Sequence, residues 1–257
     1  QGSSLGPVSY IFNASDLNLC YQTNKMHKYA YDTYLIIPSS NQDTVNSEIN
    51  SIQEWAKDNN LKLNLNKCSY MVITKAKSNN LMAAASIDDI TRVDSLKILG
   101  VTIKSNLSFT DHIDKLIKTT SQCMYALKIL KSYGLSRKLL HNVCSATVVS
   151  RLVYASPAWI GFVKSCEMNR IQAVINKCRK WGFLNKSIDI RDEINDQDNK
   201  LFRKAIASTS HVVHPLLPPV KQSQYDLRTR AHNLTLTVCS SSQSRNFIER
   251  NLFKDMF

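Results

Sequence analysis

The chain has 257 residues, 43% of them hydrophobic, which is enough to bury a core in one large domain or two modest ones. It contains no run of about 18 uncharged apolar residues and no basic start followed by an apolar stretch, so we expect neither a membrane span nor a signal peptide. The net charge is +13. Residues 1–100 hold nine Lys or Arg and nine Asp or Glu, whereas residues 101–257 hold 24 and 11. This imbalance indicates a neutral scaffold joined to a region that binds a polyanion; the alternative is a basic surface that serves solubility.

The first hundred residues alternate between helix and strand patterns. A helix is predicted from Pro7 to Leu19, and residues 26–37, rich in Tyr, Thr, Leu and Ile, predict two strands that turn at residues 30–32. The next helix is expected to be capped by Asn41 or Asp43 and to end at Asn59 and Asn60. Its predicted core stripe is Val45, Ile49, Ile52 and Trp55.

Two further strands are predicted before the helical half begins. Leu61, Leu63 and Leu65 alternate as in a half-buried strand. Residues 96–103 predict another strand, with Gly100 in its middle, where glycine often marks a bulge or a close backbone approach. Residues 75–90 have little pattern and are expected to form a loop or a hairpin.

After Thr110 the pattern is helical. Apolar residues at helical spacing continue until Gly134, and Ser136 is placed to cap a second helix that runs to about Tyr154. Helices near residues 167–181 and 195–212 follow, with Lys and Arg on their outer faces. The sequence as a whole therefore predicts an α+β fold.

The cysteines and tryptophans are expected to be structural. The seven cysteines are odd in number and widely spaced, which predicts free, mostly buried thiols in a reducing compartment, the nucleus or the cytoplasm. Trp55, Trp159 and Trp181 are predicted to be core residues, the alternative being platforms on which bases stack.

Several short motifs then occur in a characteristic order. Gln1-Gly2-Ser3-Ser4-Leu5-Gly6-Pro7 is followed by Lys28-Tyr29-Ala30-Tyr31-Asp32-Thr33 and by Asn60-Leu61-Lys62-Leu63-Asn64 with Lys67. Leu96-Lys97-Ile98-Leu99-Gly100-Val101 precedes Asp111-His112-Ile113. Further motifs are Leu152 to Trp159 and Tyr225 to Arg230. Together they resemble the reverse transcriptases of LINE-type, non-LTR, jockey-like retrotransposons, along essentially the whole chain.

The resemblance implies a fold with three parts. Residues 1–109 would be the C-terminal half of a reverse-transcriptase palm, an antiparallel sheet with helices. Residues 110–163 would be a helical thumb, and residues 164–257 a basic helical C-terminal extension. In the family the fingers and the first palm strand, which carries another essential Asp, precede the Gln-Gly-Ser motif. We therefore expect this chain to be the C-terminal part of such a polymerase.

The resemblance also implies the active site. The family uses Mg²⁺ held by carboxylates, in a two-ion mechanism that stabilises the attacking and leaving oxygens. This chain has Tyr31 where the first Asp of the hairpin is expected, which leaves Asp32 as a residual metal ligand or a simple polar turn residue. Lys67 would assist departure of pyrophosphate, or is an ordinary surface lysine. Gln1, Gly2 and Ser3 would bind nucleotide and template, and Leu99 and Gly100 would form the primer grip.

The basic half is expected to contact nucleic-acid phosphates without reading sequence. The predicted contacts are Arg170, Lys177, Arg179, Lys180, Arg203, Lys204, Arg228 and Arg230. The implied function is RNA-directed DNA polymerase acting on RNA and DNA, with this chain catalytically defective alone but retaining nucleic-acid affinity. Two alternatives stay open: a subunit active when the fingers and the missing palm strand are supplied in trans, or a pseudogene product without selected function.

Overall fold

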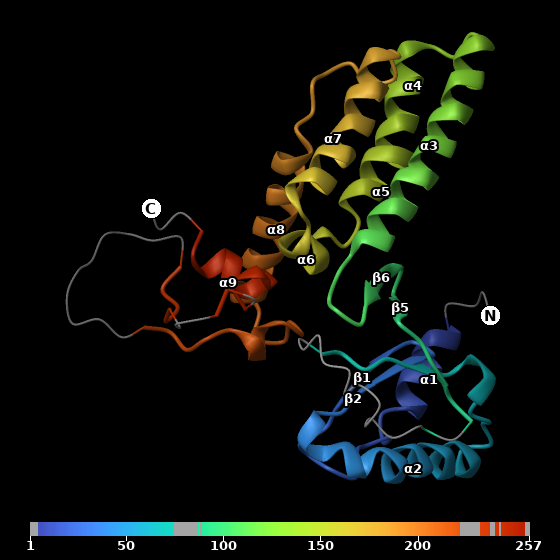
Figure 1. Ribbon diagram of the computed structural model, residues 1–257, viewed down its shortest axis with the longest axis vertical. Helices are drawn as coiled ribbons and strands as arrows, with labels where there is room; N and C mark the ends of the chain where they lie inside the picture. Colours follow the sequence, from blue (N-terminus) through green and yellow to red (C-terminus); the bar gives the residue numbers. More distant parts are fainter. Residues whose placement is uncertain are drawn as a thin grey trace. The chain divides into compact units, whose positions relative to one another are not determined.

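The computed structural model is α+β, as predicted, and describes residues 5–74, 87, 89–221, 232–236, 240–241 and 243–254. It divides into two compact units, residues 1–96 and 97–257 (Figure 1). The sequence motifs predict another division, into a palm (residues 1–109), a thumb (110–163) and an extension (164–257), and that division stays a prediction.

The first unit contains two helices longer than one turn and two small sheets in its described part. Its helices and strands are α1 (Leu5–Asn13), β1 (Lys25–Tyr29), β2 (Asp32–Ile36), α2 (Val45–Asp58), β3 (Ser69–Tyr70) and β4 (Thr91–Arg92), with 3-10 turns at Ser39–Thr44 and Leu65–Lys67. The strands β1 and β2 form the predicted antiparallel hairpin, with Tyr29 opposite Asp32. The strands β3 and β4 pair in parallel.

The core of the first unit is small and partly polar, which overturns several expectations. Its buried described residues are Ala14, Leu17, Asn24, Thr44, Glu48 and Ala56. The predicted stripe on α2 is only half-buried, because Glu48 and Ala56 take the inner positions instead. The predicted cap residues make no side-chain cap, since Thr44 occupies that position. The segment 61–65 is not a strand, because the chain there is irregular and leads into a 3-10 turn.

The second unit begins with a short hairpin and continues as a helical bundle. Its elements are β5 (Ser95–Ile98, which starts at the unit boundary), β6 (Val101–Lys104), α3 (Thr110–Ser132), α4 (Arg137–Cys144), a π-helical turn (Ser145–Val149), α5 (Ser150–Val153), α6 (Ser156–Trp159), α7 (Ser165–Lys180), α8 (Ile190–Ala207) and α9 (Phe247–Leu252), with 3-10 turns at Ile160–Phe162, His214–Leu216 and Gln243–Arg245. Figure 1 shows α3, α4 with α5, and α7 running side by side. Gly100 lies in the turn between β5 and β6, so its predicted place inside a strand is wrong.

The bundle core is apolar and continuous. It draws on α3, α4, α5, α7 and the start of α8, with Ile113, Leu152, Ile171 and Ile190 fully buried. The predicted ends of the first two helices are confirmed. Gly134 follows α3 in a left-handed conformation, with φ of 82°, and the Ser136 hydroxyl accepts a hydrogen bond from the backbone N–H of Leu139.

The helical run that Ser136 caps ends where the sequence predicts, with α5 ending at Val153. The segment Arg137–Phe162, which includes this run, is long and apolar enough, by length and composition, to cross a membrane. In the bundle the run is broken at Ala155, whose φ is 49°. Its residues Leu140, Val148 and Trp159 lie in the core. Part of this segment therefore packs in the core of the bundle.

The cysteines and tryptophans agree with their predictions only in part. The six described cysteines are free, as expected, but only Cys144 and Cys178 are buried, and Cys239 lies outside the described residues. Trp159 is a core residue, fully buried, and Trp55 is half-buried. Trp181 is 41% exposed, so its assignment to the core is wrong.

Candidate functional site

The β1–β2 hairpin presents Tyr31 and Asp32 at its tip. A two-residue turn needs backbone with positive φ, and Ala30 supplies it, with φ of 48°. Both Tyr31 and Asp32 are exposed. The position at which the family resemblance implies a catalytic carboxylate is therefore on the surface of the first unit, with an aromatic ring in place of the acid.

Tyr31 packs against α1. Its ring centroid lies 4.5 Å from that of Tyr10, and its hydroxyl lies 3.7 Å from the position that a Cβ would take at Gly6. Together with the exposed apolar residues of α1 it lines an open hollow of about 700 Å³. The Tyr31 ring therefore occupies space beside α1, with its hydroxyl near Gly6.

Two charged residues to which the sequence analysis assigned no role position this hairpin and the chain that leads into it. The Lys28 ammonium donates hydrogen bonds to the carbonyls of Ala14 and Leu17, at 2.7 and 2.8 Å, and so ties β1 to the chain after α1. The Glu48 carboxylate is fully buried on α2. It contacts residues 20–24, the segment that leads into β1.

Glu48 accepts three hydrogen bonds. The backbone N–H groups of Cys20 and Tyr21 donate to it at 3.0 and 3.1 Å, and the Asn24 amide donates at 2.8 Å. Asn24 also donates to the Thr44 hydroxyl. A buried carboxylate is stable only when its oxygens are satisfied in this way. A charged residue on the inner face of an amphipathic helix was the signal in the sequence that could have revealed it.

The residues described here do not fit a two-metal centre. Divalent ions of this class need several hard oxygen ligands that converge on one point. The described residues contain no group of three or more His, Cys, Asp or Glu side chains that could hold a metal ion. In the same described part, no hydrogen bond or ion pair links Asp32 to Lys67, which is exposed at the end of the 3-10 turn Leu65–Lys67. Gln1, Gly2 and Ser3 lie outside the described residues.

The second candidate site is the turn between β5 and β6. Leu99 and Gly100 both have positive φ, 45° and 93°, which is the conformation that a tight hairpin turn requires. The Tyr154 hydroxyl donates a hydrogen bond to the Leu99 carbonyl at 2.9 Å. A Cβ at Gly100 would lie 3.2 Å from Cε1 of the same ring. Two motifs that are 55 residues apart in the sequence therefore meet at this turn.

The same hairpin is also held from α3. The backbone N–H of Thr102 donates to Nδ1 of His112 at 3.4 Å, and Lys104 forms an ion pair with Asp111 at 2.9 Å. His112 is buried, and its ring meets Trp159 edge to face at 5.3 Å. Burial, and secondarily the charge of Lys115, lower the pKa of His112, which keeps the ring neutral and able to accept the hydrogen bond.

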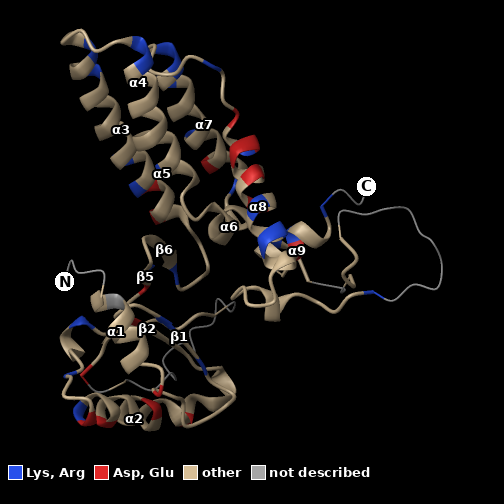
Figure 2. Cartoon of the chain, turned by 180° about the vertical axis from the view of Figure 1, so that it is seen from behind, with Lys and Arg blue, Asp and Glu red and all other residues tan. Residues whose placement is uncertain are grey.

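The predicted phosphate contacts are distributed unevenly. Lys177, Arg179 and Lys180 are exposed and close together in the last turn of α7. Arg170 lies further back on the same helix, and its guanidinium is paired with Asp114 at 2.7 Å. Arg203 and Lys204 are exposed on α8, apart from that group in the sequence and on another helix. Arg228 and Arg230 lie outside the described residues. Figure 2 shows basic residues gathered where α3 and α7 end and α4 begins.

Comparison with known proteins finds a similarity in the first part of the chain. Residues 1–103 match the family model described as reverse transcriptase (RNA-dependent DNA polymerase). This segment includes both the hairpin at Tyr31 and the turn at Leu99. No solved structure matches the chain.

One relative comes from a retrotransposable element. The chain is 23% identical over 201 residues to a retrovirus-related Pol polyprotein from the type-1 retrotransposable element R1 of Nasonia vitripennis. The match covers 72% of this chain and 59% of the relative. The chain thus spans about three fifths of this relative's length, and it is similar to the reverse transcriptases of LINE-type, non-LTR retrotransposons.

Proposed function

We propose that this chain is a nucleic-acid-binding fragment of a non-LTR reverse transcriptase that does not polymerise DNA. In this proposal the first unit is part of the palm, and the helices after Thr110 are the thumb and a basic extension. Its ligands are RNA and DNA, bound through phosphates and without sequence preference. Its place is the reducing interior of the cell, in the nucleus or the cytoplasm, and six free cysteines are consistent with that.

The observation that carries the proposal is the packing of Tyr31. Mg²⁺ is held in proteins by carboxylates, carbonyl groups and water, so a phenol at this position does not supply the ligand that the family's Asp supplies. The Tyr31 ring also rests against Tyr10, which directs it toward α1. If metal ions stabilise the transition state by several kcal/mol, their loss lowers the rate at least about 10³-fold.

The affinity for nucleic acid is supported by the charge and shape of the second unit. Its hairpin turn at Leu99 and Gly100 is fixed by Tyr154 and His112, as a surface that receives a primer strand must be fixed. Of the predicted phosphate contacts on α7, three are exposed in one turn. A polymerase that lacks its metal centre would keep these contacts.

A four-way primer-extension assay tests the proposal. The chain is measured with Tyr31 or with Tyr31→Asp, each with and without a polypeptide that supplies the fingers and the first palm strand of an intact relative. Two-metal chemistry needs carboxylates from both sources, so we expect Mg²⁺-dependent extension only when both repairs are present. Binding of a labelled primer–template in the same samples controls for folding. Extension by the Tyr31 chain with the added polypeptide would instead identify a subunit completed in trans.

A further inference from the structure

The end of the helical bundle carries an unusual charge distribution. Between Asp114 and Asp189 the only acidic residue is Glu167. Its carboxylate is buried, where it accepts hydrogen bonds from the Thr110 hydroxyl at 2.7 Å and the Lys164 backbone N–H at 2.9 Å. No exposed acid from this stretch therefore offsets its lysines and arginines.

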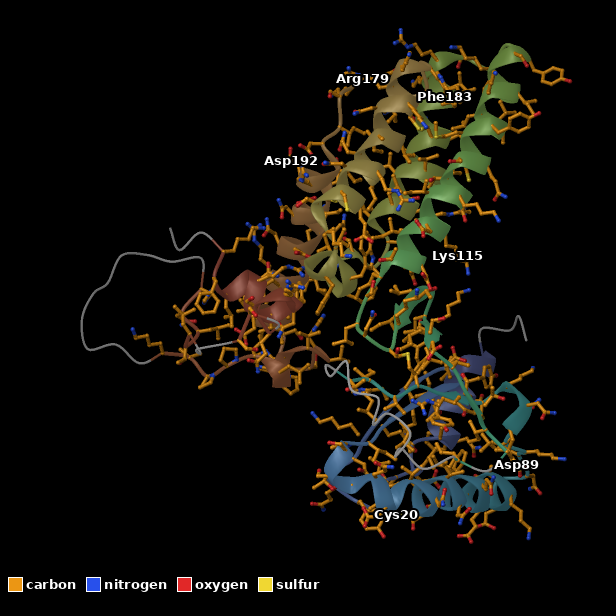
Figure 3. The ribbon with its side chains drawn as sticks, viewed as in Figure 1. Cys20, Asp89, Lys115, Arg179, Phe183 and Asp192 are labelled. Carbon is orange, nitrogen blue, oxygen red and sulfur yellow. The ribbon has the colours of Figure 1, made fainter. Side chains whose placement is uncertain are left out.

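Six of these cations lie where α3 and α7 end and α4 begins. We call this surface the bundle tip; it comprises the last turns of α3 and α7, the first turn of α4 and the loop before α8. Its exposed cations are Lys131, Arg137, Lys138, Arg179, Lys180 and Lys186. Figure 3 shows Arg179 and Phe183 at this end of the bundle and Lys115 much further along α3.

The tip is a fixed surface, because hydrogen bonds connect its parts. The Lys131 ammonium, at the end of α3, donates to the Trp181 carbonyl after α7 at 2.7 Å. The Asn185 backbone N–H donates to Nδ1 of His141 on α4 at 3.4 Å. These hydrogen bonds join the ends of the three helices at the tip.

Two aromatic side chains stand among these charges. Tyr133, directly after α3, is 85% exposed, and Trp181, directly after α7, is 41% exposed. The Trp181 ring is supported by the buried Phe183, edge to face at 5.9 Å. Exposed aromatic faces beside a row of cations are the combination that single-stranded nucleic acid requires, since unpaired bases stack while the phosphates meet the charges. A duplex hides its base faces and cannot use them.

We propose that the bundle tip binds single-stranded nucleic acid, with bases stacked on Tyr133 and Trp181 and phosphates on the surrounding cations. This inference rests on the proposed nucleic-acid-binding function and adds to it a second surface, at the opposite end of α3 from the Leu99–Gly100 turn. On this proposal the bundle tip binds unpaired strands in preference to duplex.

The test uses the whole chain with Trp55→Phe, so that tryptophan emission comes from the buried Trp159 and from Trp181. It is titrated with a single-stranded oligothymidylate and with a duplex of equal length. We expect the single strand to quench Trp181 and the duplex to leave its emission unchanged. Tyr133→Ala and Trp181→Ala should each weaken single-strand binding about five-fold or more, whereas Tyr133→Phe should retain it.

A charge-matched pair of variants separates the tip from general attraction. Arg179→Gln with Lys180→Gln should lower the salt dependence of single-strand binding by about 1.4 log units per log unit of salt. Lys115→Gln with Lys118→Gln removes the same charge from exposed positions near the start of α3, and should have a clearly smaller effect on affinity. Circular dichroism of every variant confirms folding.

The outcomes distinguish the two proposals. Strong oligonucleotide binding without quenching of Trp181 would overturn the proposal for the bundle tip and leave the proposed function standing. Equal losses of single-strand affinity in the two charge-matched pairs of variants would do the same. The absence of any binding at low salt would overturn both. Quenching by phosphatidylserine vesicles that exceeds quenching by the oligonucleotide would assign the tip to a lipid surface and overturn the inference.

Discussion

Replacing Glu48 should loosen the first unit and the hairpin that it presents. In Glu48→Gln one oxygen remains, and it can keep the hydrogen bonds from Tyr21 and Asn24, which share Oε1. The new NH₂ group then faces the Cys20 N–H, which loses its acceptor. One part-buried donor left unsatisfied costs about 1–3 kcal/mol. Glu48→Ala removes all three acceptor contacts and should cost about 3 kcal/mol or more.

Hydrogen exchange measures this loss of stability at the amides of the β1–β2 hairpin. Amides of β1 and β2 that exchange through opening of the first unit should exchange about 5- to 150-fold faster in Glu48→Gln, the equivalent of 1–3 kcal/mol. Glu54→Gln is the matched control, since Glu54 is exposed on the same helix, and it should change stability by no more than about 0.5 kcal/mol. Identical exchange in the two variants would refute the view that the buried carboxylate organises the approach to the hairpin.

Two predictions concern the hairpin of the second unit. Because the pKa of His112 is lowered in the fold, the unfolded chain takes up a proton first, near pH 6.5. The free energy of unfolding should therefore be at its full value above about pH 6.5 and fall as the pH drops below it, a slope that His112→Gln should flatten in urea titrations. Gly100→Ala should destabilise the unit by about 1–2 kcal/mol, because a left-handed backbone disfavours a Cβ. Gly134→Ala is the control, because Gly134 also has a positive φ, 82°, but a Cβ there would have nothing within 4 Å. If Gly100→Ala lowers the free energy of unfolding by less than Gly134→Ala does, the proposed packing of Tyr154 against the turn is contradicted.

The helical half was predictable because its signals are local. The helix end at Gly134 and the cap at Ser136 each depend on the conformation of a few neighbouring residues. The β1–β2 hairpin was found for the same reason, with its turn between Tyr29 and Asp32. Apolar periodicity placed Ile113, Leu116 and Leu127 on one face of a helix, and all three are buried in the bundle core.

What the sequence could not predict depends on contacts between distant residues. Tyr154 meets Leu99 across 55 positions, and no local pattern reveals that pair. Glu48 lies on the inner face of α2, but its hydrogen-bond partners in residues 20–24 are distant in the sequence. Trp181 was assigned to the core by composition, yet the end of α7 leaves its ring exposed. Segment 61–65 alternates like a strand, but the structure pairs it with no neighbouring strand among the described residues.

The helix α3 sets a length scale for any strand bound by the second unit. It has 23 residues, from the hairpin that His112 anchors to the last turn that holds Lys131. At 1.5 Å per residue it is about 34 Å long, which corresponds to about ten stacked nucleotides at 3.4 Å each. A shorter oligonucleotide can reach one end of the helix at a time, whereas a longer one can occupy both. The second contact is then intramolecular and favoured by a high local concentration. If strands bind at both of the proposed surfaces, the affinity of the chain should therefore rise abruptly when the strand reaches about ten nucleotides.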